Sequence, residues 1–142
     1  MSLFSAMAVS ASGMAAERTR AELLVENLAN AETTRTPEGG PYHRKDAVFV
    51  SQPMAPSFAS LFESHLEEGV AVEQISVDQR AGERRYLPGH PDAGPDGYVT
   101  FPRINPAEDM VDLVSASRSF QADVAAISSL KDMIMRSIDL FK

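Results

Sequence analysis

Apolar residues recur at spacings of three and four near both ends of the chain. The N-terminal row is interrupted only by Arg18, and its members are Phe4, Met7, Ala11, Met14, Ala21, Val25 and Leu28. The C-terminal row is interrupted by Ser117 and Lys131, and its members are Met110, Leu113, Phe120, Val124, Ile127, Ile134, Ile138 and Phe141. A period of about 3.5 residues held over this length is typical of helices that wind around other helices. The pattern predicts a long helix at each end, and these ends are the expected interaction surface.

The first helix is expected to run from the first few residues to about Ala29. Gly13 is its one weak interior residue and costs about 1 kcal/mol relative to alanine. Asn27 and Asn30 lie where the helix is expected to end, and asparagine tolerates the left-handed conformation of a C-terminal cap. We therefore predict that residues 1–34 are an N-terminal assembly helix and that both asparagines are cap residues.

Residues 35–42 cannot continue that helix. Pro37 and Pro41 lack the amide hydrogen that a helix needs, and Gly39 and Gly40 supply the positive φ angles that other residues resist. The bend is therefore expected to set the angle at which the following residues leave the helical core.

The middle of the chain, residues 35–104, is predicted to be a small β-rich region. Alternating or β-branched residues suggest strands around 47–50, 69–77 and 98–101. Residues 57–66 fit either a short helix or a loop. Nearly all of the residues from 88 to 97 are turn formers, so this segment is expected to be an exposed connection.

The second helix has the clearest start. Asn105 is suited to the N-cap, Pro106 to the first helical position, and Glu108 places a negative charge where a helix favours it. No glycine or proline interrupts the rest of the row. Residues 105–142 are thus predicted to be a C-terminal assembly helix. The predicted fold is mainly α with a small β-rich middle, and its long N- and C-terminal helices pair as a coiled coil.

Two helices paired only with each other leave apolar residues facing outward. These residues include Leu3, Leu24, Val111, Val114 and Leu140. Burying a large apolar side chain contributes about 1.5–3 kcal/mol, whereas ordering about 30 residues costs on the order of 30–60 kcal/mol of backbone entropy. From the pattern alone, an ordinary intramolecular helix face is the commoner explanation. The outward residues nevertheless offer neighbouring molecules a surface to cover.

Composition narrows the function classes. The 142-residue chain has a net charge of -7, which argues against nucleic-acid binding because phosphate contacts need clustered lysine and arginine. Residues 51–102 hold most of this acidity, with eight acidic and three basic side chains. The chain has no cysteine, so it forms neither a disulfide nor a zinc–thiolate site.

The sequence shows neither a secretory signal nor a transmembrane segment. The first residues lack the basic region of a cleavable signal peptide, and no stretch approaches the roughly 20 apolar residues of a membrane span. If the protein leaves the cytoplasm, we expect an export route that needs no cleaved signal peptide.

Candidate catalytic and metal-binding residues are few. His90 with Asp92 and Asp96 resembles part of a metal site, but prolines and glycines surround them and no second histidine is near, so a surface loop is favoured. Nothing in the sequence places Glu67 and Glu68 in a cleft, as a glycosidase pair requires, so these carboxylates are expected to be solvated. No nucleophile motif or phosphate-binding loop is present. We therefore predict a protein that is not an enzyme and has no cofactor and no metal.

Residues 27–30 read Asn-Leu-Ala-Asn, and this core resembles that of the axial proteins of the bacterial flagellum in general. The Thr-Thr-Arg-Thr-Pro-Glu-Gly-Gly-Pro-Tyr and Pro-Gly-His-Pro-Asp runs are more specific and are similar to the proximal rod proteins of the basal body. The similar runs, in chain order, are residues 12–20, 26–42, 86–93, 97–99, 104–106 and 115–122.

The resemblance implies a structural subunit of the flagellar rod, the drive shaft between the inner-membrane ring and the hook. It implies export through the flagellar type III apparatus into the periplasmic space. The implied partners are copies of the chain in a helical array, other rod proteins and the proteins of the ring/rod junction. A generic coiled-coil adaptor or secreted assembly protein is the alternative, and a peptidoglycan-processing enzyme is a third possibility.

The resemblance also places subunit assembly on the striped helix faces. The expected interface residues are Met7, Met14, Ala21, Val25, Leu28, Asn27, Asn30, Met110, Leu113, Phe120, Val124, Ile127, Ile134 and Ile138. Any part that Asn27 and Asn30 have in subunit contacts is implied by the resemblance alone.

Overall fold

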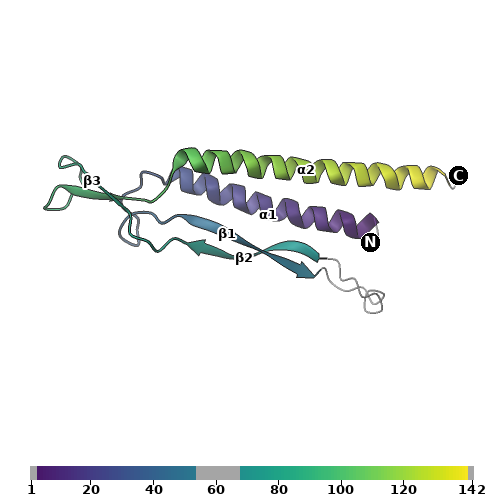
Figure 1. The fold of residues 1–142 in the computed structure, drawn as a ribbon, viewed down its shortest axis with the longest axis horizontal. Coiled ribbons are helices and arrows are strands. Elements are labelled where there is room, and N and C mark those ends of the chain that lie inside the picture. The colour runs from purple at the N-terminus through teal and green to yellow at the C-terminus, as the bar shows by residue number, and fades with distance from the viewer. Residues whose placement is uncertain (1–2, 54–67, 141–142) are drawn as a thin grey trace.

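The computed structural model describes residues 3–53 and 68–140. Its elements are α1 (Leu3–Ala29), β1 (Lys45–Pro53), β2 (Glu68–Val77), β3 (Glu83–Tyr86), β4 (Tyr98–Phe101) and α2 (Pro106–Asp139). The two helices are antiparallel and lie side by side, so the start of α1 and the end of α2 are at the same end of the molecule (Figure 1). The prediction of two long terminal helices around a small β-rich middle is confirmed.

The start of α2 follows the predicted capping chemistry. The side chain of Asn105 accepts a hydrogen bond from the backbone N–H of Ala107 at 3.2 Å, and Pro106 occupies the first turn. Glu108 and Asp109 add negative charge to that turn, which the helix dipole favours. At 1.5 Å per residue, the 34 residues of α2 span about 50 Å and the 27 of α1 about 40 Å. In Figure 1, α2 extends beyond the start of α1.

The end of α1 differs from the prediction of a left-handed asparagine cap. Among the described residues, only Gly39, Gly40 and Gly97 have positive φ angles. Asn30 instead uses its side-chain amide, which donates to the backbone oxygen of Glu26 at 2.9 Å. The carbonyls of Asn27 and Leu28 accept from the backbone N–H groups of Asn30 and Ala31 at 3.2 and 3.3 Å, so tight turns end the helix without a left-handed residue. The predicted positive φ angles of Gly39 and Gly40 are confirmed at 93° and 78°.

The middle region consists of two antiparallel hairpins. In the first, β1 pairs with β2 from Lys45 opposite Val77 to Pro53 opposite Glu68, with a register shift between Val48 and Phe49. The second pairs β3 with β4. The strand β3 was not predicted, because its sequence Glu-Arg-Arg-Tyr shows no alternation of apolar and polar residues. The prediction for residues 57–66 lies outside the described residues.

The β1–β2 hairpin packs along α1, on the side away from α2 (Figure 1). A two-stranded hairpin is marginally stable by itself in water, so it needs such a surface. The first helix is therefore covered on two sides, whereas α1 is the only described helix or strand that packs extensively on α2. This arrangement overturns one expectation. Leu24 was predicted to face outward, but it is only 4% exposed.

Candidate assembly interface

The face of α2 that packs on α1 coincides with only half of the predicted stripe. Leu113, Phe120, Ile127 and Ile134 are half-buried on this face. At the alternate positions of the row, the residues that pack on α1 are 109, 116, 123 and 130, each one residue before the predicted position. The full packed row is Asp109, Leu113, Ala116, Phe120, Asp123, Ile127, Leu130 and Ile134. The other predicted members point away, so Met110 is 59% exposed, Val124 44% and Ile138 50%.

Small residues explain why this face of α2, and not the predicted one, packs on α1. Ala16 of α1 and Ala116 of α2 are both buried, and Gly13 lies against Asp123. A Cβ atom added to Gly13 would be 2.9 Å from the Oδ2 atom of Asp123, which is closer than ordinary contact. Bulky side chains here would hold the helices apart, whereas small ones let the backbones approach. A side chain at position 13 would therefore require the carboxylate of Asp123 to shift.

The predicted N-terminal stripe also divides between covered and exposed positions. Met7, Met14, Ala21 and Leu28 are half-buried, as is Asn30. The exposed positions of α1 include three members of the predicted stripe, Phe4, Ala11 and Val25, and from Ala11 onward they keep a 3–4 spacing. They are Leu3, Phe4, Ala11, Ala15, Arg18, Glu22, Val25 and Ala29.

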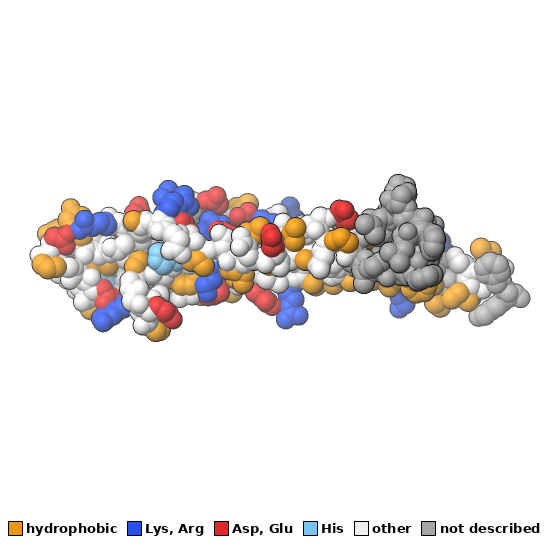
Figure 2. Space-filling model, turned by 90° about the horizontal axis from the view of Figure 1, so that it is seen from below, with side chains coloured by type: hydrophobic (Ala, Val, Ile, Leu, Met, Phe, Trp, Pro, Cys, Tyr) orange, Lys and Arg blue, Asp and Glu red, His pale blue; other side chains and the backbone are white. Residues whose placement is uncertain are grey.

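Large apolar side chains are exposed in both helices and in the strands that the structure describes. Those of the helices and their ends are Leu3, Phe4, Val25, Met110, Val111, Val114, Val124, Met133, Met135, Ile138 and Leu140. The hairpin adds Phe49, Val50, Val70, Ile75 and Val77, and Figure 2 shows apolar side chains scattered among charged ones over the face that it views. On α2, an open groove of about 460 Å³ is lined by Met110, Val111, Val114, Ser115, Arg118 and Ser119.

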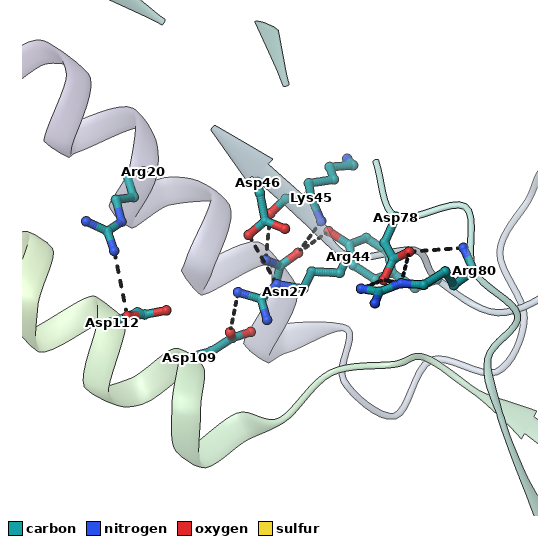
Figure 3. Close-up of polar contacts among 10 residues, drawn as sticks. Arg20, Asn27, Arg44, Lys45, Asp46, Asp78, Arg80, Asp109 and Asp112 are labelled. Carbon is teal, nitrogen blue, oxygen red and sulfur yellow. Dashed lines mark hydrogen bonds and ion pairs between the residues drawn. The ribbon is translucent and has the colours of Figure 1, made fainter. Parts of the chain in front are cut away.

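A buried polar cluster joins the end of α1 to the start of β1. The amide of Asn27 donates to the backbone oxygen of Lys45 at 2.8 Å (Figure 3). Its oxygen accepts from the backbone N–H of Lys45 at 2.9 Å and from the hydroxyl of Tyr42 at 3.1 Å. Asn27 therefore pairs with the strand as a neighbouring strand would, and it does not cap the helix. Because its side chain is fully buried within the subunit, any effect on assembly would act through the position of β1.

Tyr42 is buried in the same cluster. Burial, and next the nearby charge of Glu26, raise the pKa of its hydroxyl to about 12. Glu26 in turn forms an ion pair with the side chain of Lys45 at 2.5 Å. The neutral tyrosine is thus strongly favoured, which keeps its hydroxyl available as a donor to Asn27.

Charged side chains of α2 lie close to charged groups of the other elements. Arg44, just before β1, lies 3.1 Å from Asp109 and 3.1 Å from Asp46 (Figure 3). Arg20 of α1 lies 3.6 Å from Asp112. Sequence reasoning missed these residues because it followed the apolar row alone. The small residue Ala116 was the available signal, since Asp109 lies one heptad before it.

The loop at residues 88–97 is tied to the segment that follows α1. The hydroxyl of Thr34 donates to Asp92 at 2.7 Å, and Arg35 lies 3.8 Å from the same carboxylate. The backbone N–H of Asp92 donates to the ring of His90 at 3.1 Å. The two most specific sequence runs therefore contact each other. Within the described part of the chain, no group of three or more His, Asp or Glu residues gathers as a metal site, and no helix is long and apolar enough to cross a membrane.

Comparison with known proteins defines the class to which this arrangement belongs. Residues 96–140, which include β4 and α2, match the family described as "Flagellar basal body rod FlgEFG protein C-terminal". The chain is 37% identical to the flagellar basal-body rod protein FlgC of Bacillus subtilis, over the full length of both. It is 35% identical to FlgC of Borreliella burgdorferi, over 100% of this chain and 99% of the relative. It is 33% identical to FlgC of Salmonella typhimurium, over 99% and 98%.

These matches place the chain among the axial proteins of the flagellar basal body. The chain belongs to the FlgC family of flagellar basal-body rod proteins. The resemblance found in the sequence is confirmed.

Proposed function

We propose that this protein is a structural subunit of the flagellar rod that assembles through its terminal helices. The observation that carries the proposal is the distribution of its apolar side chains. Among the described residues, seven hydrophobic side chains are buried, whereas nineteen large ones are exposed. Scattered apolar residues are normal on a surface, whereas apolar residues gathered in a groove mark interaction sites, and on α2 Met110, Val111 and Val114 line one open groove together.

The exposed apolar residues of α2 allow an estimate of the free energy that one contact with a neighbouring subunit would gain. Fully burying a large apolar side chain contributes about 1.5–3 kcal/mol, so a half-exposed one has about 1 kcal/mol left to gain. Eight such residues on α2 and its C-cap would together gain about 8 kcal/mol. Association costs about 4–15 kcal/mol in lost motion, so a single helix contact is marginal. Stable assembly then needs several neighbours at once, as an array provides.

In this proposal the two helices pair as a coiled coil within each subunit. The 3–4 spacing of the packed row on α2 and the antiparallel contact with α1 support that pairing. Residues 1–34 and 105–142 serve as the assembly helices, and residues 35–104 form the middle region. The interface residues proposed from the sequence contribute in two ways. Met110, Val124, Val25 and Ile138 meet neighbours directly, whereas the half-buried ones hold the helix pair together.

Family membership supports the remaining parts of the proposal. The subunit contacts copies of itself in a helical array, other rod proteins and the proteins of the ring/rod junction. It reaches the periplasmic space through the flagellar type III export apparatus without a cleaved signal peptide, and it acts without catalysis or a cofactor. A generic coiled-coil adaptor would instead form a closed small oligomer.

The exposed face of α2 provides the test. Val111→Asp places a carboxylate on the apolar groove and should abolish rod assembly and swimming, because an unpaired buried charge costs several kcal/mol. Gln121→Glu is the matched control, since it adds the same charge to an exposed polar position of α2. Export into the periplasm should be normal in both variants. Normal swimming of the Val111→Asp strain, or purified wild-type protein that forms only a closed oligomer, would reject the proposal.

A further inference from the structure

Asp109 is an acid buried without hydrogen bonds. Its side chain, in the first turn of α2, is fully buried, and neither carboxyl oxygen has a hydrogen-bond partner among the described residues. The Nη2 atom of Arg44 lies 3.1 Å from Oδ1, close enough for an ion pair but without hydrogen-bond alignment (Figure 3). An ionised carboxylate in this position has lost its water and recovered little in exchange.

Negative charge exceeds positive charge around this carboxyl group. On α2 it is flanked by Glu108 and Asp112, and from β1 it faces Asp46. Within the described ranges, Arg44 is the one cation in contact with it, and this guanidinium is shared with Asp46 at 3.1 Å. The neighbouring groups on α1 and ahead of β1 are already engaged. They are Arg20, which pairs with Asp112, Glu26, which pairs with Lys45, and the neutral hydroxyl of Tyr42.

The helix start opposes this penalty only in part. A carboxylate in the first turn of a helix gains about 0.3–1 kcal/mol from the helix dipole when exposed. Desolvation acts in the other direction and is the largest influence, so burial raises the pKa of Asp109, with Arg44 lowering it to a smaller extent. Protonation leaves the Arg44–Asp46 pair intact while it removes the buried charge.

We propose that Asp109 is a proton-operated latch between α2 and the segment that enters β1. Proton uptake removes the desolvation cost of the buried charge and so stabilises the docked first turns of α2, and proton release weakens that docking. The latch is a property of the single subunit and does not depend on the proposed role in the rod.

The sign of the pH dependence follows from linkage. An acid whose pKa is raised in the folded state stabilises the fold at low pH, and this contribution is lost as the pH rises through the folded-state pKa. Carboxyl groups whose pKa is lowered in the folded state have the opposite effect, because they stabilise the fold at higher pH. Hydrogen bonds from Arg80 hold the pKa of Asp78 below its usual value, and the backbone N–H of Tyr98 lowers that of Asp96. The latch must therefore be measured as a difference between variants at each pH.

Amide hydrogen exchange in the full-length monomer tests the latch. The opening constants of residues 110–116 are compared between wild type and Asp109→Asn from pH 4.5 to 8, because comparison at one pH cancels intrinsic exchange rates. We expect Asp109→Asn to open less than wild type at pH 8, by about tenfold for each unit by which burial raises the pKa. The ratio should approach one as the pH falls. Asp132→Asn removes the same charge from an exposed position of α2 that is not among the charges around Asp109, so it is the matched control and should show no such convergence.

Two results would overturn the latch. One is greater opening of Asp109→Asn than of wild type at pH 8, which would mean that the ion pair with Arg44 outweighs desolvation. The other is a ratio that does not change with pH. Should Asp109→Asn fail to fold, carbon-13 NMR titration of the Asp109 carboxyl in wild type decides the question. A midpoint above the unfolded-chain value supports the latch, and a midpoint at or below that value rejects it.

Discussion

Replacing Asn27 by alanine removes the cluster that holds β1 on α1. The substitution deletes one donor and one acceptor, so the backbone N–H and oxygen of Lys45 and the hydroxyl of Tyr42 lose their partners together. A buried polar group without a partner costs about 1–3 kcal/mol. Lys45 is only half-buried and recovers some hydration, so we expect the free energy of unfolding to fall by about 3–5 kcal/mol.

Urea denaturation followed by circular dichroism measures this loss, with Asn30→Ala as the matched control. Asn30 has the same side chain just past the end of the same helix, but it is half-buried and bonds only Glu26 and Thr33 among the described residues. Its substitution should cost about 1 kcal/mol. Amide exchange at Lys45 should accelerate only in the Asn27 variant. If the two variants lose equal stability, Asn27 is not the connection between α1 and β1 that its geometry indicates.

Three further predictions address the helix contact, the buried tyrosine and the turn. Gly13→Ala should not stabilise the wild-type protein, although alanine is favoured in a helix by about 1 kcal/mol, because the added Cβ meets the carboxylate of Asp123. In an Asp123→Ala background the same substitution should be stabilising, and equal effects in both backgrounds would refute close packing at this position. Tyr42 contributes stability that is complete below pH 10 and is lost as the pH rises toward 12, so the urea midpoint should fall across that interval more steeply in wild type than in Tyr42→Phe. Gly39→Val with Gly40→Val forces two positive φ angles on valine and should permit export but yield few or crooked rods, whereas normal numbers of straight rods in electron micrographs would make the turn a simple tether.

Features set by local chemistry were predictable from the sequence. The start of α2 follows from Asn105 and Pro106, and the positive φ angles of the turn follow from Gly39 and Gly40. Features that depend on distant partners were not. Asn27 has the composition of a cap residue, and only the arrival of β1 eighteen residues later gives its amide a different partner. The residues next to Asn27 in the sequence do not indicate that its side chain pairs with β1 and does not cap α1.

The phase of the α2 stripe shows why apolar pattern alone misplaced half of the contact row. A heptad search finds where large apolar residues recur, whereas the contact face is decided by which side chains let two backbones approach. Ala116 faces α1 and is buried, while its neighbour in the predicted stripe, Ser117, is exposed. Taking the contact through Ala116 turns Met110 and Val124 outward. The same small residues that close the helix pair therefore leave bulky residues on the surface, and the proposed assembly would bury these residues against neighbouring subunits once the two helices of each subunit have paired.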